Sequence, residues 1–224
     1  MKIICSEDVV DILEPQISVE LIEVIENKQD FQNILKDKKV SSILIGPGNG
    51  INNETKARAL MALAFIDHVV LDADALTVFE NNPEELFIDC YPHTILTPHE
   101  GEFKKIFGKE IDEINDRVLK TKEASIKSNT TVVLKGANTI IASPSGDVVI
   151  NKSSATYLAT AGSGDVLAGI ITSLVGKNKM NAFDAACAGV WLHSEIGTIL
   201  GAGLIAEDII DLIPVTVKKL LKMR

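Results

Sequence analysis

The sequence predicts an α/β protein with a mainly parallel sheet covered by helices on both faces. Short apolar runs that are typical of buried strands alternate with longer segments in which apolar residues recur at helical spacing. Sheets built in this way bind ligands at the carboxyl ends of their strands. Each unusual motif of this chain directly follows a predicted strand, so we expect the motifs to meet at one edge of the sheet.

The expected elements cover most of the chain. Strands are predicted at 40–45, 69–71, 94–96 and 131–134, with a hairpin at 138–142 and 148–151. Helices are predicted at 55–65, 101–107, 114–128, 166–175, 182–200 and 206–221. Asn52 or Asn53 is expected to cap the first of these helices. The alanine-rich start of 182–200 indicates tight internal packing.

The composition limits the classes of protein to which this chain can belong. Of 224 residues, 46% are hydrophobic and 24% are charged, which is ordinary for a globular chain. Lys and Arg number 22 against 31 Asp and Glu, and the net charge of −9 argues against nucleic-acid or anionic-membrane binding. Three scattered cysteines indicate reduced thiols and no metal cage. Without a signal-like or membrane-spanning apolar run, linker or repeat, we expect one soluble cytoplasmic domain.

The most informative segment runs from Ala159 to Gly169. A turn of small residues lets backbone approach a ligand, and Asp165 follows it at the start of an apolar helical stretch. If a helix begins near Gly164, its first N–H groups form a site for an anion. Asp165 then stands beside that site with the task of taking a proton. The alternative is an ordinary acidic first turn that favours the helix dipole.

Two motifs follow the first two strands. Gly46-Pro47-Gly48-Asn49-Gly50 departs from a dinucleotide fingerprint, because Ile51 stands where the third glycine belongs. Asp72 keeps a weak Rossmann-type interpretation open, and a plain tight turn is the alternative. Asp72 and Asp74 suit Mg²⁺ or its waters, or else they cap a helix at 75–80.

Two further motifs follow the third and fourth strands. In Thr97-Pro98-His99-Glu100-Gly101-Glu102, an acidic first helical turn explains the glutamates but not His99, whose imidazole can donate or accept. In Lys135-Gly136-Ala137-Asn138-Thr139, the lysine suits a phosphate, and a solvated strand-end lysine is the alternative. The remaining histidines lack ligand spacing and are predicted to be structural: His68, His93 and His193.

In this order, the motifs resemble those of the ADP/ATP-dependent NAD(P)H-hydrate dehydratase family of the ribokinase-like superfamily. The turn before Asp165 alone indicates only a ribokinase-like kinase, whereas the motifs at His99 and Lys135 narrow the resemblance to the dehydratases. The resemblance implies a ribokinase-like three-layer sandwich with a mostly parallel central sheet and helices on both faces. The matching segments are Gly46–Gly50, Leu71–Leu76, Leu96–Glu102, Leu134–Thr139 and Ala159–Gly169.

The resemblance also implies an activity and a set of site residues. The family restores NADHX and NADPHX, which are hydrated nicotinamide cofactors, by transferring a phosphoryl group from ADP or ATP to the hydrate and eliminating phosphate. Asp165 matches the residue that contacts the hydrate and activates its hydroxyl. Contacts to the damaged cofactor match Gly50 and His99. The anion hole matches the N–H groups of Ala161, Gly162, Ser163 and Gly164. Adenine-nucleotide contacts match Lys135, Gly136, Ala137, Asn138, Thr139 and Gly164.

Other properties are implied by the family alone. They are Mg²⁺ with ligands not assigned, a homo-oligomer (a tetramer), and an NAD(P)HX epimerase acting on the same substrate pool. The chain is expected to be one domain, 1–224, that lacks the family's usual amino-terminal segment. It also has Ser154-Ala155-Thr156 where the family tends to have Gly-Asn before its Ala-Thr run. Two alternatives stay open: a ribokinase-like kinase for a thiamine-precursor alcohol, and a truncated nucleotide-binding protein without catalysis.

Overall fold

Each of two units of the chain contains its own β-sheet. The computed structural model describes residues 2–16, 21–152, 156–176 and 179–222, and the chain divides into the units Met1–Val40 and Ser41–Arg224. All motifs singled out above lie in the second unit, so every residue of the candidate site described below comes from that unit. The expectation of one domain over 1–224 stays a prediction.

The amino-terminal unit is a small α/β element. Its two strands pair in parallel, with Lys2 opposite Leu21. The side chain of Asn27 accepts hydrogen bonds from the N–H groups of Gln29 and Asp30 and so starts the longest helix of this unit. In chain order the elements are β1 (Lys2–Cys5), η1 (Glu7–Val9), α1 (Val10–Leu13), η2 (Glu14–Gln16), β2 (Leu21–Val24) and α2 (Lys28–Leu35).

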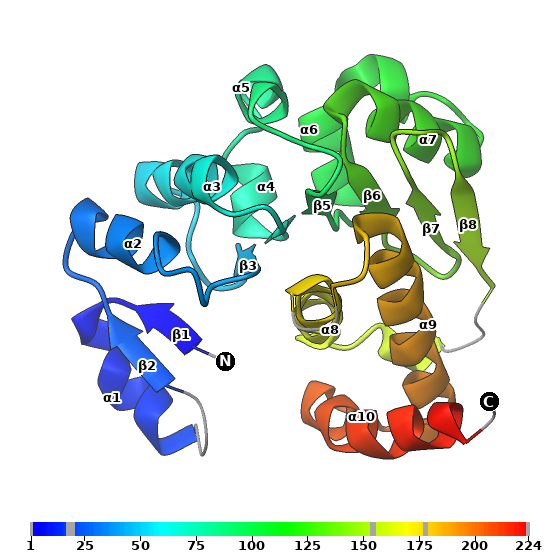
Figure 1. Ribbon diagram of the computed structural model, residues 1–224. Helices are drawn as coiled ribbons and strands as arrows, with labels where there is room; N and C mark the ends of the chain where they lie inside the picture. The colour runs from blue at the N-terminus through cyan, green and yellow to red at the C-terminus, as the bar shows by residue number, and fades with distance from the viewer. Residues whose placement is uncertain (1, 17–20, 153–155, 177–178, 223–224) are drawn as a thin grey trace. The chain divides into compact units, whose positions relative to one another are not determined.

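The second unit contains a six-stranded sheet of order β3-β4-β5-β6-β7-β8 (Figure 1). The first four of these strands are parallel, and the last two add an antiparallel hairpin, as the sequence predicts. The parallel part aligns the carboxyl ends of its strands along one edge. The strands are β3 (Ile43–Ile45), β4 (Val69–Leu71), β5 (Ile95–Leu96), β6 (Thr131–Leu134), β7 (Thr139–Ala142) and β8 (Val148–Asn151).

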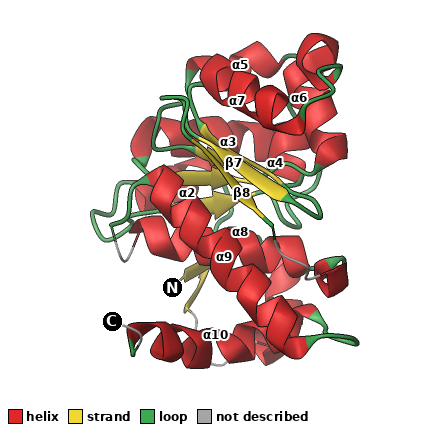
Figure 2. Cartoon of the chain, turned by 90° about the vertical axis from the view of Figure 1, so that its right-hand side faces the viewer, coloured by secondary structure: helices red, strands yellow, loops and turns green. Residues whose placement is uncertain are grey.

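Helices cover both faces of this sheet, which confirms the predicted α/β class (Figures 1 and 2). Helices α8 and α9 pack on one face, while α3 and α7 contact the strands from the other. The helices are α3 (Asn53–Phe65), α4 (Asp74–Thr77), α5 (Pro83–Ile88), α6 (Glu100–Asp112), α7 (Arg117–Ser128), α8 (Ser163–Gly176), α9 (Ala182–Leu200) and α10 (Ala206–Leu221), with a 3₁₀ turn η3 (Thr156–Leu158). None of the helices in the described ranges has the length and apolar content to cross a bilayer.

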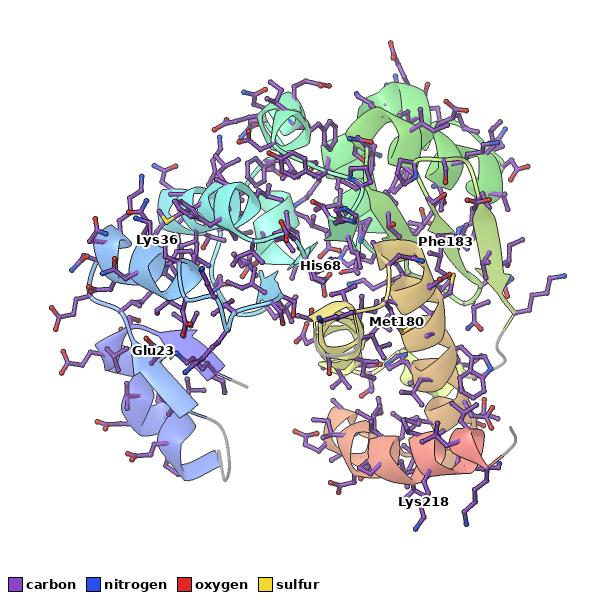
Figure 3. All side chains as sticks on the ribbon, viewed as in Figure 1. Glu23, Lys36, His68, Met180, Phe183 and Lys218 are labelled. Carbon is purple, nitrogen blue, oxygen red and sulfur yellow. The ribbon has the colours of Figure 1, made fainter. Side chains whose placement is uncertain are left out.

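The main core lies between the sheet and helices α8 and α9. Each central strand contributes a buried aliphatic side chain to it, and the small residues of α9 allow that helix to approach closely. A Cβ atom at Gly189 would lie 2.6 Å from the Ile171 side chain, so the predicted tight packing of the alanine-rich stretch is confirmed. Met180 and Phe183, near the start of α9, pack partly buried against this core (Figure 3).

Several predicted boundaries differ from the observed ones. The first strand of the sheet begins at Ile43, because Val40 donates its N–H to Asp37 in a turn after α2. Helix α7 begins at Arg117, because the Asp116 side chain accepts from two N–H groups of its first turn. Asn52 caps α3, as predicted. The expectation that Asp72 or Asp74 caps the helix after β4 is wrong. Ala73 stands at the cap position, and no side chain makes a capping hydrogen bond there.

Candidate active site

A buried ion pair joins two strand ends at the centre of the candidate site. Asp72 follows β4 and Lys135 follows β6, and Lys135 Nζ lies 2.7 Å from Asp72 Oδ1. The aspartate is fully buried and the lysine side chain is only 18% exposed. Lys135 is therefore not the solvated strand-end lysine of the alternative interpretation. The second oxygen of Asp72, Oδ2, is buried and has no hydrogen-bond partner among the described residues.

The glycine-rich turn after β3 is a tight turn packed against the backbone of Asp72. Gly46 has φ +135°, and a Cβ atom there would lie 1.7 Å from the backbone oxygen of Asp72, so only glycine fits. Asn49 Oδ1 accepts from the Gly46 N–H at 2.7 Å and closes the turn. The Gly50 N–H donates to Asp74 Oδ2 at 2.8 Å, which ties the predicted substrate contact Gly50 to the aspartate after β4.

His99 has a structural role that the sequence analysis did not foresee. Its Nδ1 accepts hydrogen bonds from the N–H groups of Gly101 and Glu102, while Glu102 Oε2 accepts from the His99 N–H at 2.8 Å. These bonds form a capping box at the start of α6. The capping alternative thus accounts for the histidine as well as the glutamates. The imidazole stays 60% exposed, and its predicted contact with substrate stays a prediction.

The turn Lys135–Thr139 is held from outside by a helix residue. Arg117, the first residue of α7, donates from Nη1 to the Asn138 carbonyl at 2.7 Å and from Nε to Glu100 Oε1 at 2.7 Å. Thr139 Oγ1 closes the turn by donating to the Gly136 carbonyl at 3.1 Å. Sequence reasoning missed Arg117, because nothing local to α7 indicates that its guanidinium reaches the turn between β6 and β7.

The turn before α8 delivers backbone N–H groups beside Lys135. Helix α8 begins at Ser163, one residue before the expected Gly164, after Gly162 with φ +79°. The Ser163 N–H already donates to Thr160, so this member of the predicted anion hole is occupied within the chain. In the described part of the chain, the N–H groups of Gly164 and Asp165 have no partner. A Cβ at Gly164 would lie 3.4 Å from Lys135 Nζ, so turn and lysine are neighbours.

A buried histidine contacts the residue at which α8 begins. His193 on α9 has its Nε2 2.9 Å from Ser163 Oγ, and both side chains are buried. Burial lowers the pKa of His193 to about 4, with the charge of Lys135 lowering it further and the Ser163 hydrogen bond opposing the shift. The imidazole is therefore neutral at physiological pH. It was predicted to be merely structural, and the sequence carries no local signal that places it under the turn.

Asp165 is the exposed carboxylate of the site. Partial burial raises the pKa of its carboxyl above the ordinary value. The negative charges of Asp72 and Asp74 raise this pKa further, while Lys135 opposes them. A carboxylate whose pKa is raised towards the working pH is suited to general-base chemistry. The four charged groups therefore form one electrostatic cluster at the strand ends.

The structure brings most of the predicted site residues to this edge. Lys135, Gly164 and Asp165 lie together, Gly50 is tied to them through Asp74, and the turn of His99 reaches them through Glu102, whose Oε2 is 4.0 Å from Lys135 Nζ. Ala161 and Gly162 precede α8, while Gly136, Ala137, Asn138 and Thr139 continue from Lys135.

His68 lies away from the described site. His68 precedes β4, so it stands at the opposite end of that strand from Asp72, and its ring packs edge-on against His93 with centroids 5.5 Å apart. Burial lowers the pKa of His68, with the neighbouring His93 adding to the shift. Ser154 and Ala155, where the chain departs from the family pattern, lie outside the described residues.

Comparison with known families accounts for this arrangement of turns. The sequence profile of the NAD(P)H-hydrate dehydratase family matches residues 1–212. The chain belongs to this family. It is 36% identical over 190 residues to the ADP-dependent (S)-NAD(P)H-hydrate dehydratase of Neisseria meningitidis serogroup B, covering 79% of this chain and 63% of the relative. It is 38% identical over 165 residues to the bifunctional NAD(P)H-hydrate repair enzyme Nnr of Gloeobacter violaceus, covering 74% of this chain and 32% of that relative.

Solved structures support the same family and fold. The ADP/ATP-dependent NAD(P)H-hydrate dehydratase of Bacillus subtilis, co-crystallised with ATP and Mg²⁺, is 26% identical, with a TM-score of 0.78 over 98% of this chain and 81% of that one. A ribokinase-like superfamily protein of Enterococcus faecalis reaches a TM-score of 0.82 at 24% identity, over 97% of this chain and 76% of that one. The predicted ribokinase-like fold is confirmed. The match spans less than two thirds of each curated relative named above.

Proposed function

We propose that this chain dehydrates NADHX and NADPHX, with ADP or ATP as the phosphoryl donor. The observation that carries the proposal is the position of Asp165. It is an exposed carboxylate of raised pKa, beside the ammonium of Lys135 and N–H groups that have no partner among the described residues. This arrangement holds a proton acceptor next to groups that bind phosphate. The names of the relatives from Neisseria and Bacillus support this substrate and both nucleotides.

In the proposed first step, Asp165 takes the proton of the hydroxyl on the hydrated nicotinamide ring. The oxygen forms a bond to the terminal phosphorus of the nucleotide, and the bond from that phosphorus to the leaving nucleotide oxygen breaks. The N–H groups at the start of α8 and the charge of Lys135 stabilise the transferring phosphoryl group. In the second step, phosphate leaves with the C–O bonding electrons. Loss of a proton from the adjacent carbon then restores the ring double bond.

The remaining residues are proposed to bind the two substrates. Gly164 and the turn Lys135–Thr139 hold the adenine nucleotide, since the exposed small residues of that turn let a ligand reach backbone. Gly50, His99 and Asp165 contact the hydrated cofactor. The capping box keeps the His99 ring at the head of α6 with most of its surface open to a ligand.

Magnesium fits the buried end of the site as an ion that the nucleotide and water complete. Asp72 Oδ2 has no hydrogen-bond partner among the described residues, and Mg²⁺ is commonly held by one or two carboxylates together with substrate phosphates. The described residues contain no group of three or more His, Cys, Asp or Glu side chains able to hold a metal alone. We propose Asp72 as the protein ligand. A bound ion would neutralise phosphate charge during transfer.

Three further proposals rest on family resemblance. The chain is proposed to act in the cytoplasm, to form a homo-oligomer, and to share its substrate pool with an NAD(P)HX epimerase. Light scattering on the purified chain tests the oligomer, which a monomeric mass at micromolar concentration would contradict.

The test of the proposed activity is recovery of reduced-nicotinamide absorbance from NADHX with ADP or ATP. The native chain is expected to restore the absorbance band, and Asp165→Asn is expected to slow the rate about 10³-fold, since a positioned base supplies an effect of this order. Asp211→Asn, which changes an exposed carboxylate of α10, is the matched control and keeps the native rate.

Each other outcome points to an alternative. An unchanged rate in Asp165→Asn means that Asp165 is not the base. Absence of recovery together with phosphorylation of a pyrimidine or thiazole alcohol replaces the proposal by a ribokinase-like kinase. Nucleotide binding without turnover of either substrate class supports the non-catalytic alternative.

A further inference from the structure

We infer that Arg117 is a positioning residue that holds the turn Lys135–Thr139 in its nucleotide-binding shape. The inference rests on the proposed function, because that turn is the proposed nucleotide contact. Arg117 starts α7, and its side chain is 32% exposed. Its guanidinium reaches the backbone of Asn138, which lies 21 positions later in the chain. The contact is therefore a tertiary one, and it joins α7 to the turn between β6 and β7.

Three atoms of the guanidinium act as a clamp. Nη1 donates to the Asn138 carbonyl at 2.7 Å, and Nη2 makes a longer contact of 3.5 Å to the Lys135 carbonyl. The two carbonyls lie on either side of the turn, so one rigid planar group fixes its width. Nε donates to Glu100 Oε1 at 2.7 Å, which orients the guanidinium. A fork of fixed donors performs this task better than a single ammonium.

Glu100 is itself held by a second cation, so its position relative to the guanidinium is fixed. Lys120 donates to Glu100 Oε2 at 2.7 Å, and the Lys120 side chain is only 8% exposed. Burial raises the pKa of Glu100, but the hydrogen bonds from Lys120 and Arg117 outweigh burial, and the pKa is lowered overall. Glu100 therefore stays ionised at neutral pH. It is also the first residue of α6, so the network joins the turn that carries His99 to the turn that carries Lys135.

The lack of a side chain at Gly136 leaves room for the guanidinium beside the turn. A Cβ atom at Gly136 would lie 2.7 Å from Arg117 Nη2, closer than real Cβ contacts. Gly136 has ordinary φ, so a side chain there needs no left-handed backbone, but it would displace the end of the Arg117 side chain from the turn. The turn and the arginine therefore fit each other closely, which is what a positioning role requires.

The test compares Arg117→Met and Arg117→Lys in the full chain, with Lys127→Met as the matched control on the same helix. Lys127 pairs with Glu84 of α5, and its ammonium lies over the ring of Phe87. Arg117→Met is expected to weaken ADP or ATP binding about tenfold in calorimetry, the effect of one charge-assisted hydrogen bond, and to raise the nucleotide KM more than it lowers kcat. Arg117→Lys restores the charge opposite Glu100 without the fork, so it is expected to recover only part of the affinity.

A second measurement does not depend on the enzyme activity. Trypsin cleavage after Lys135, followed by mass spectrometry under native conditions, is expected to speed up in Arg117→Met and to stay unchanged in Lys127→Met. Equal nucleotide affinity and equal cleavage in native chain and Arg117→Met would overturn the inference, and so would full rescue by Arg117→Lys. If the native chain turns over no NADHX, the proposed function fails, and the cleavage rates alone decide whether Arg117 holds the turn.

Discussion

The two ends of the candidate site hold the same kinds of charge in opposite environments. At the buried end, Asp72 is fully buried and paired with Lys135 at 2.7 Å. At the exposed end, Asp165 stands on the first turn of α8 with a raised pKa and no ion pair among the described residues. Burial with a partner fixes a charge in place, whereas partial burial without a partner leaves a carboxylate ready to take a proton. The buried end therefore suits the proposed binding role, and the exposed end suits the proposed proton transfer.

Backbone geometry explains why the ends differ. Asp72 continues directly from a buried strand, and the glycine turn at Gly46 packs on its backbone carbonyl, so the side chain is fully buried in the folded chain. Asp165 follows a surface turn whose small residues leave it open. The raised pKa of Asp165 arises partly from Asp72, so the buried end also sets the properties of the exposed end.

The largest expected effect on stability comes from removing the cation at the buried end. Lys135→Met leaves the buried Asp72 carboxylate without its partner, and we expect the free energy of unfolding to fall by about 3 kcal/mol. Urea denaturation measures it. Lys105→Met removes an exposed pair with Glu80 and serves as the control, with a change of about 0.5 kcal/mol or less. The double variant Asp72→Asn/Lys135→Met is expected to regain part of the loss, and a loss equal to that of the control would show that the pair is not a stabilising centre.

A second effect on stability, confined to acidic pH, is expected from the histidine that contacts the start of α8. The pKa of His193 is lowered from 6.5 to about 4, so the unfolded chain binds a proton that the folded chain rejects between these values. The folded state therefore loses stability as the pH falls from about 6.5 to about 4, by up to about 3 kcal/mol at this site. Replacing His193 by Gln removes the titrating group. Across this range, the melting temperature of His193→Gln is expected to change less with pH than that of the native chain. An equal pH dependence in both proteins would contradict the assignment.

The sequence predicted the fold better than it predicted the contacts inside the site. Periodic apolar patterns place β6 and helices α9 and α10 at their observed bounds, because these patterns arise from local burial. The pairing of Lys135 with Asp72 joins residues 63 positions apart, and no local pattern encodes it. The same holds for Arg117, which reaches the turn of Asn138, and for His193 beneath Ser163. Motifs show which turns carry function, while tertiary packing decides which side chains support those turns.

The smallest expected effect tests the exposed end directly. Because the folded-state pKa of Asp165 is raised above its ordinary value of 3.8, the ionised carboxylate destabilises the folded chain above that folded pKa. Asp165→Asn is therefore expected to be slightly more stable than the native chain at neutral pH, although it loses activity. As the pH falls through the raised pKa towards 3.8, the native carboxylate takes up its proton. The gap between the two proteins, which is the difference in their free energies of unfolding, then closes. Urea denaturation of both proteins at several pH values measures the gap. A gap that is the same at every pH would mean that packing, and not charge, separates the two proteins, and the electrostatic contrast between the two ends of the site would then be lost.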